Sequence, residues 1–382
     1  MKGRIYIFKA LFALMTALYV FSIFPGVCAF AQGTSYEKDE ISGIFNDNTE
    51  DEERQVSSRF LELFLSKAES AEPEAYSGLK YYVGGEAFGV RLSGVGVKVV
   101  GTAREEGGPL KADDRIIKIN GYPIETVDQV RQIIASHGGE KLLLEIEREG
   151  KRSSLSVKPS YNGKEYNLGA ILTDCAQGIG TLTYVVDDGS FGGLGHGISD
   201  GGEGGVFSMK SGTLTGIILA GTKQSECGKP GELRGVLTDQ TVGTVIRNTD
   251  CGIFGIMSEE YANELCTGAP IELATRGEVH TGDAKIVCTV KGSEKREYSI
   301  RIERIDRHAT GSKCFRIKVT DNELLALTGG IVRGMSGSPI IQDGKLVGAV
   351  THVMVADPTE GYGIFIENML EAARQGIQPK AA

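Results

Sequence analysis

The chain has 382 residues, of which 41% are hydrophobic, so it can bury the cores of two or three globular domains. Its 53 glycines, with short runs rich in Val, Ile and Thr, favour a β-rich fold with tight turns over a helical bundle. The formal net charge of −9 argues against nucleic acid as a principal partner, because phosphate binding requires basic patches.

The N-terminal residues are typical of an export signal. Basic residues up to Lys9 precede an uncharged apolar run at 10–24, and small residues at 29–31 offer a cleavage site. Because no charge occurs between Lys9 and Glu37, the same stretch is also long enough to anchor the chain in a membrane. We therefore expect an exported protein in which residues 1–31 are a signal peptide or an anchor.

An acidic stretch follows this segment. Residues 35–55 carry mostly acidic charges and suit a solvated tether, and residues 56–70 have the apolar spacing of a short amphipathic helix. We expect residues 32–78 to form this tether and helix.

The cysteines do not indicate a metal site. The chain has seven of them at wide, irregular spacing, with no CxxC pair. An exported chain permits disulfides, and free, partly buried thiols are the equal alternative. We expect no metal and no organic cofactor.

Residues 79–159 are predicted to contain short strands, turns and one helix. The runs AFGVRL, GVKVVG and KLLLEIERE are typical of strands, DDRIIKING of a strand closed by the Asn120–Gly121 turn, and TVDQVRQIIASHGG of a helix that ends at glycine. The segment GGPLKADDRIIKINGYPIETVDQVRQII resembles PDZ domains of the bacterial protease-associated type. The resemblance implies that the N–H groups of Phe88, Gly89 and Val90 bind the carboxylate of a peptide that adds as a strand. A domain that binds nothing and only spaces its neighbour is the alternative.

Residues 160–382 are predicted to form one larger β unit. Short apolar runs from GAILTD to LVGAVTHVMV are separated by turn residues, and IFIENMLEAARQ has the pattern of a C-terminal helix. These runs predict an all-β sandwich or a pair of barrels.

The stretch RGMSGSP is the strongest candidate for chemistry. A catalytic serine needs a tight turn that presents its hydroxyl and aims two backbone N–H groups at the developing oxyanion. Ser336 is the predicted nucleophile, with Gly334 and Ser336 as N–H donors, and Ser338 is expected to be structural. A G-x-S-x-G elbow is excluded because Ser338 occupies its last glycine position.

The segment GMSGSPIIQDGKLVGAVTHV resembles the end of chymotrypsin-type serine proteases. There, a G-x-S-G-x-P turn leads through a hairpin to a strand that pairs with the substrate. The resemblance implies that Thr351, His352 and Val353 form the substrate strand. The overall expectation is a mostly β protein with some α structure: a PDZ-like domain followed by a chymotrypsin-like β-barrel serine peptidase domain.

Together, LGHGISD and GMSGSPIIQ behind a PDZ-like domain resemble the stage IV sporulation protein B family of serine peptidases. The resemblance implies a triad of His196, Asp321 and Ser336. Asp321 lies close before Ser336 in the sequence and has an open alternative as a helix N-cap. Asp250, Asp306 and a dyad without a carboxylate are the other possibilities for orienting the base.

The family resemblance also implies a biological setting. Such peptidases are exported to the space between the two forespore membranes, cleave themselves, and cleave a membrane-bound regulator of sigma-factor processing. Expected partners are therefore a peptide or protein substrate of this kind and a peptide segment bound by the PDZ-like domain. A non-catalytic scaffold that binds membrane partners is the rival from another class, and a thiol protease is a weaker one.

Overall fold

The computed structural model describes residues 78–102, 109–199 and 205–375. The predicted signal peptide or anchor (1–31) and nearly all of the predicted tether and helix (32–78) lie outside these ranges. Within them, no helix is both long enough and apolar enough to cross a membrane.

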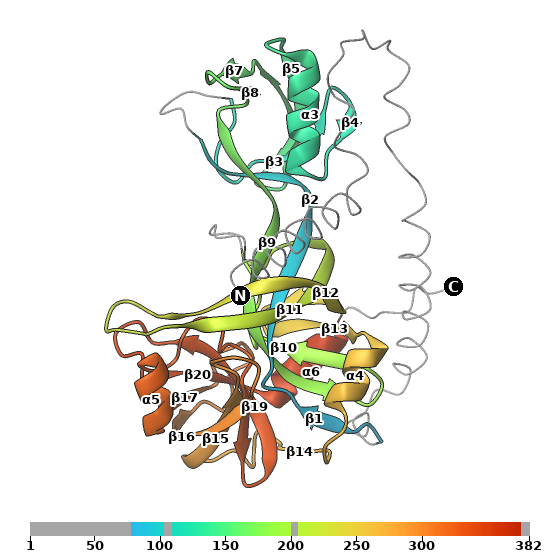
Figure 1. The fold of residues 1–382 in the computed structure, drawn as a ribbon. Helices are drawn as coiled ribbons and strands as arrows, with labels where there is room; N and C mark the ends of the chain where they lie inside the picture. The colour runs from blue at the N-terminus through green and yellow to red at the C-terminus, as the bar shows by residue number, and fades with distance from the viewer. Residues whose placement is uncertain (1–77, 103–108, 200–204, 376–382) are drawn as a thin grey trace, which may run out of the picture. The chain divides into compact units, whose positions relative to one another are not determined.

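The fold is mostly β, as predicted, with short helices between the strands (Figure 1). The 11-stranded sheet contains β1 (Tyr81–Val83), β2 (Ala87–Thr102), β3 (Arg115–Ile119), β4 (Tyr122–Pro123), β5 (Leu142–Arg148), β6 (Lys151–Val157), β9 (Ala170–Val186), β10 (Ser190–Gly193), β11 (Met209–Lys223), β12 (Glu232–Thr249) and β13 (Gly252–Met257). The 7-stranded sheet contains β14 (Glu272–Leu273), β15 (Gly282–Cys288), β16 (Arg296–Ile305), β17 (Phe315–Val319), β18 (Pro339–Gln342), β19 (Lys345–Val353) and β20 (Glu360–Phe365). A separate ribbon pairs β7 (Ser160–Tyr161) with β8 (Tyr166–Asn167). The helices are α3 (Val127–His137), α4 (Glu259–Leu265), α5 (Asn322–Thr328) and α6 (Ile366–Arg374).

Two closed barrels account for most of these strands. The first runs β2–β9–β10–β13–β12–β11 and closes by pairing β11 with β2. The second runs β19–β18–β15–β16–β17–β20 and closes by pairing β20 with β19. Apolar side chains that point inward fill each barrel, among them Phe191 and Leu214 in the first and Ile286 and Phe365 in the second. The prediction of a mostly β protein with a PDZ-like domain and a β-barrel domain is confirmed.

The PDZ-like unit is inserted into a hairpin of the first barrel. The first part of β2, residues 87–93, pairs with residues 175–181 of β9 inside the barrel. Farther along, residues 98–102 of β2 pair with residues 170–173 of β9 inside the PDZ-like unit. The predicted division into 79–159 and 160–382 is therefore wrong at both ends of the PDZ-like domain: β1 pairs with the barrel part of β9, the start of β2 is a barrel strand, and the start of β9 completes the PDZ-like sheet.

The local predictions for the PDZ-like unit are confirmed. Thr126 caps α3 in a capping box with Gln129, and Gly138 ends the helix at φ 57°. Asn120 and Gly121 both have positive φ, as a tight turn of this kind requires. Val130 and Ile134 on one face of α3 pack into a separate apolar core with strands of the same unit.

The predicted carboxylate-binding loop is wrong. Phe88, Gly89 and Val90 lie inside β2, where they pair with β9 on one side and Gly89 and Val90 also pair with Thr215 and Leu214 of β11. Their backbone groups therefore serve the barrel, and Phe88 and Val90 are buried in its core. No peptide can add as a strand at these residues.

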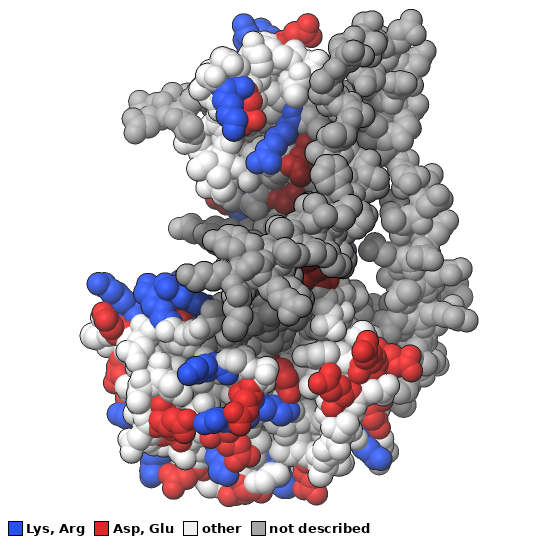
Figure 2. All heavy atoms as spheres, viewed as in Figure 1, with Lys and Arg blue, Asp and Glu red and all other residues white. Residues whose placement is uncertain are grey.

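Charged side chains are mixed over the surface. On the described part of the face in Figure 2, Lys and Arg lie among Asp and Glu, and several form exposed pairs such as Lys285 with Glu297 at 2.7 Å. Such pairs contribute little to stability.

Candidate active site

The turn from Gly334 to Ser338 joins the segment after α5 to β18. Gly334 and Gly337 have φ of 101° and 96°, which favours glycine at both positions. A Cβ on Gly337 would lie 1.9 Å from the carbonyl oxygen of Thr181. The backbone angles therefore require glycine at 334 and 337, and the close approach to β9 also requires it at 337.

The two serines of the turn have different surroundings. Ser338 is fully buried, and its Oγ donates a hydrogen bond to the carbonyl of Met335 at 2.6 Å. Ser336 is half-buried, and its Oγ donates to the carbonyl of Thr351 at 2.8 Å. Only Ser336 is placed to meet a substrate, and Ser338 has a structural contact within the turn.

The peptide planes of the turn orient the N–H groups of Gly334 and Ser336. The carbonyl of Arg333 accepts from the N–H of Leu233 at 2.8 Å, and the carbonyl of Met335 accepts from Ser338 N at 3.0 Å. Because C=O and N–H point in opposite directions across a trans peptide, these bonds turn the N–H groups of Gly334 and Ser336 the other way. Within the described residues neither N–H has an acceptor, so both are available to an oxyanion.

His196 lies just after β10 in a tight turn. Leu194 and Gly195 precede it with φ of 66° and 67°. The Nδ1 atom of His196 lies 2.8 Å from the carbonyl of Gly197. This contact favours the tautomer with a proton on Nδ1, which leaves Nε2 as an acceptor. Burial lowers the pKa of His196, and the bond to Gly197 opposes that shift only in part.

Asn248 on β12 holds the loop that carries His196. Its Oδ1 accepts from the N–H of Ile198 at 2.9 Å, and its Nδ2 donates to the carbonyls of Ile198 and Phe207 at 2.9 and 3.0 Å. The side chain thus ties together two points of the loop after His196. Asn248 was not among the predicted site residues, because a lone asparagine near a strand end carries no distinguishing local signal.

Thr351 and His352 of β19 touch both candidate catalytic elements. Thr351 accepts the bond from Ser336, and the rings of His196 and His352 lie 4.9 Å apart at an angle of 39°. Burial, with smaller contributions from the charges of His196 and Lys313, lowers the pKa of His352 to about 4. Ser336 therefore contacts Thr351 and His196 contacts the next residue, His352, and no hydrogen bond joins Ser336 to His196 in the described part of the chain.

The structure does not bring Asp321 to His196. Its carboxylate accepts from Leu324 N at 3.0 Å and from Ser299 N at 3.2 Å, so it is the N-cap of α5. The prediction that Asp321 orients the base is corrected accordingly, and the alternative of an N-cap is confirmed. Asp306 accepts from His308 N, and Asp250 is exposed in the turn between β12 and β13. Among the described residues, no carboxylate bonds to His196.

The predicted substrate strand lies at the end of β19 in the second barrel, where Thr351 is buried and His352 and Val353 are half-buried. Thr351, His352 and Val353 end β19, where His352 pairs with Tyr362 and Val353 with Gly361 of β20. On the other side, pairing with β18 ends at Ala349. Beyond Val350 that edge carries no strand among the described residues, so an extended peptide can add there.

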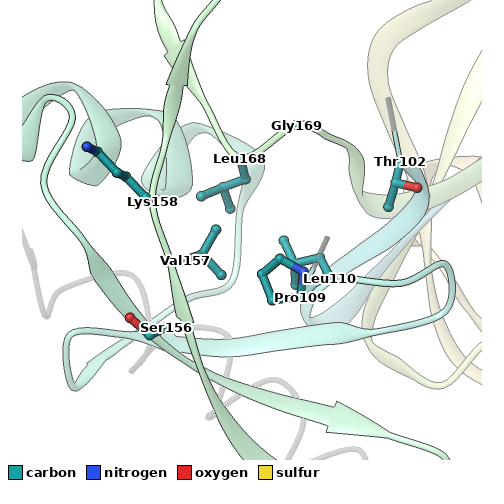
Figure 3. A pocket seen from close by; sticks show the side chains of 8 residues that line it. All are labelled: Thr102, Pro109, Leu110, Ser156, Val157, Lys158, Leu168 and Gly169. Atoms are coloured by element: carbon teal, nitrogen blue, oxygen red, sulfur yellow. The ribbon is translucent and has the colours of Figure 1, made fainter. Parts of the chain in front are cut away.

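Other features do not add to this site. Across the described ranges, the six cysteines are free thiols and no group of three His, Cys, Asp or Glu side chains is arranged to hold a metal ion. A pocket of about 140 Å³ belongs to the PDZ-like unit, where Leu110, Val157 and Leu168 face one another (Figure 3). None of its lining residues is a predicted site residue.

Several known proteins are similar to parts of this chain. Zinc metalloprotease RasP of Geobacillus kaustophilus is 44% identical over 59 residues, which are 15% of this chain and only 14% of that protein. The active form of the Rv3671c protease from M. tuberculosis is 14% identical, with 54% of this chain and 78% of that chain covered at a TM-score of 0.32. The PDZ domain of an SdrC-like protein from Listeria monocytogenes is 21% identical, with 21% and 90% covered at a TM-score of 0.20. At these TM-scores the two structures add nothing to what the topology shows.

Two family models match the chain. The model described as a PDZ domain matches residues 101–148, inside the unit inserted between β2 and β9. The model described as SpoIVB peptidase S55 matches residues 164–370, more than half of the chain, and includes both His196 and Ser336. The chain therefore belongs to the SpoIVB peptidase S55 family, as a peptidase that carries a PDZ domain.

Proposed function

We propose that this peptidase is a serine endopeptidase in which Ser336 is the nucleophile and His196 is the general base. The observation that carries the proposal is the turn at Ser336. It presents a half-buried hydroxyl beside two N–H groups that have no acceptor in the described residues. This hydroxyl contacts Thr351, and His196, in a loop of the other barrel, packs against the adjacent residue His352.

The mechanism is acyl transfer through a serine ester. Nε2 of His196 takes the proton of Ser336 Oγ as the oxygen attacks the peptide carbonyl, and the N–H groups of Gly334 and Ser336 stabilise the oxyanion. The C–N bond then breaks, and His196 returns the proton to the leaving amine. Water repeats the attack with the same base and releases the acid. The carbonyl of Gly197 holds the tautomer of His196, so the proposed unit is a dyad without a carboxylate.

An extended peptide binds along the edge of β19 that pairs with no strand beyond Val350 among the described residues. Its N–H donates to the carbonyl of Thr351 and replaces Ser336 Oγ as the donor there. The released hydroxyl then turns to His196. Substrate binding thereby couples to activation of the nucleophile, in keeping with catalytic hydrogen bonds that form only in the complex.

Family membership supports a role in sporulation signalling. On this proposal, the protein is exported to the space between the forespore membranes, cleaves itself, and cleaves a membrane-bound regulator of sigma-factor processing. Its PDZ domain binds a peptide segment of a partner at a place other than Phe88, Gly89 and Val90, because those residues belong to the barrel.

Labelling with a fluorophosphonate probe tests the assignment of the nucleophile. Wild-type protein and S338A should be labelled and should cleave a peptide, whereas S336A should do neither, with kcat reduced on the order of 10⁶-fold. Labelling of S336A, or loss of labelling in S338A alone, would contradict the proposal. A wild-type protein that is folded but neither labelled nor active would favour the non-catalytic scaffold.

A further inference from the structure

Two threonines of the first barrel lie completely buried against the nucleophile turn. Thr181 and Thr183 are on the same face of β9, and both are 0% exposed. Burying a hydroxyl costs free energy unless it is hydrogen bonded. A hydrophobic β-branched residue would fill the same space without that cost. The hydrogen-bond partners of the two hydroxyls therefore indicate why threonine occupies both positions.

Each hydroxyl donates to a carbonyl of the turn. Thr181 Oγ1 donates to Gly334 O at 2.8 Å, and Thr183 Oγ1 donates to Gly337 O at 2.8 Å. The backbone N–H of Thr181 also donates to Ser336 O at 2.9 Å. The carbonyls of Gly334, Ser336 and Gly337 are therefore all held by two residues of the opposite barrel.

These bonds fix the peptide planes on both sides of the nucleophile. Thr181 orients the plane after Gly334 and the plane after Ser336, and Ser338 orients the one between them through Met335 O. With these planes set, the direction of the Cα–Cβ bond of Ser336 is determined. The carbonyl of Thr181 also accepts from the N–H of Leu194 at 3.3 Å, so the same residue contacts the loop that begins two residues before His196.

We propose that Thr181 and Thr183 are positioning residues that align Ser336 and its oxyanion donors with His196. The inference rests on the proposed roles of Ser336 and His196. It adds that two uncharged side chains of β9, in the first barrel, hold the turn of Ser336 in position relative to His196.

The test is the full-length Thr181→Val variant, which removes one hydroxyl and keeps the shape of the side chain. Because small misplacement of a nucleophile costs up to about 10²-fold in rate, we expect kcat for a peptide to fall by about 10-fold to 10²-fold with KM within about two-fold of wild type. Thr181→Ser, which keeps the hydroxyl, should restore most of kcat. Thr183→Val should lower kcat less, since it frees only the carbonyl after the nucleophile.

Thr289→Val is the matched control. Thr289 is also a buried threonine, 3% exposed, directly after barrel strand β15, and its hydroxyl donates to the carbonyl of Gly85 at 3.0 Å, outside the turn. We expect T181V and T289V to lower the unfolding temperature to a similar extent, and only T181V to lower kcat. A T181V protein with kcat within about two-fold of wild type, or a T289V protein with an equal loss of kcat, overturns the inference.

The S336A variant distinguishes a failure of the proposed function from a failure of the positioning role alone. If S336A retains activity, the proposed function fails, whereas an inactive S336A beside a fully active T181V rejects only the positioning role. Should T181V not fold, T183V decides in the same assays, and a wild-type kcat for T183V overturns the inference.

Discussion

The turn that carries Ser336 and the loop that carries His196 are held in place in different ways. The turn is fixed from several sides by buried partners on β9 and β12 and by Ser338 within the turn. The loop of His196 depends mainly on one half-buried side chain, Asn248, and the histidine itself bonds to the carbonyl of its own neighbour Gly197.

This difference indicates where the site can tolerate change. Many backbone contacts restrict the geometry of the nucleophile turn, so a substitution that forces its backbone to move should abolish most of the activity. A loop held by one amide has more freedom, so its loss should give graded effects. Neither arrangement uses a carboxylate among the described residues, which separates this site from a triad with a buried aspartate.

The largest effect is expected from Gly337→Ala. The added Cβ would lie 1.9 Å from the carbonyl oxygen of Thr181, and the backbone there has φ 96°. We expect kcat to fall by at least about 10²-fold, because the turn must move relative to β9. Peptide cleavage by the purified protein measures this loss.

Gly344→Ala is the matched control for that substitution. Gly344 also has positive φ, at 77°, but a Cβ there meets nothing within 4 Å. The strain should lower the free energy of unfolding by about 1 kcal/mol and leave kcat nearly unchanged. Equal activity of the two variants would show that the turn is less constrained than its contacts indicate.

A smaller loss is expected when the loop of His196 is released. Asn248→Leu removes all three hydrogen bonds of the amide, and we expect kcat to fall by about 10-fold with little change in KM. Asn248→Asp keeps only the acceptor for Ile198 N and should show at least part of the same loss. Full activity of N248L would mean that the base does not need this anchor.

The pH dependence of kcat/KM should report His196. The base acts when neutral, and burial lowers its pKa from the ordinary value of 6.5, so activity should be lost only as the pH falls below 6.5. A profile between pH 4 and 8 measures the acid limb. His280 serves as a control because Asp343 raises its pKa at an exposed position, and H280Q should leave the limb unchanged. An acid limb above pH 6.5 would contradict the environment described for His196.

The smallest effect on activity is expected at Asp321. Asparagine caps a helix about as well as aspartate, so Asp321→Asn should change neither stability nor kcat by much, and Asp321→Ala should cost about 1 kcal/mol of unfolding free energy. Urea unfolding and peptide cleavage together measure this. A loss of kcat of more than about 10²-fold in a stable D321N would restore Asp321 as a partner of the base and reject the dyad.

The sequence by itself determined the features that depend on neighbouring residues. The turn at Ser336, helix α3 with its end at glycine and the Asn120–Gly121 turn were predicted correctly, because glycine angles and helix-end bonds act within a few residues. The fold class also followed from the pattern of short apolar runs. β10 and β20 were missed, since their short, glycine-containing segments lack the alternation of a typical strand.

Only the tertiary structure decided which distant segments meet. Phe88 to Val90 look locally like a PDZ loop, and their place in the barrel depends on pairing with β9 and β11, more than 80 residues along the chain. The family resemblance suggested Asp321 as a catalytic residue and its local sequence allowed an N-cap, and its contacts with Leu324 and Ser299 settle its position. Hydrogen bonds to backbone groups of other segments give Thr181, Thr183 and Asn248 their roles. Long-range strand pairing brings these partners together, and the local residue pattern does not predict it.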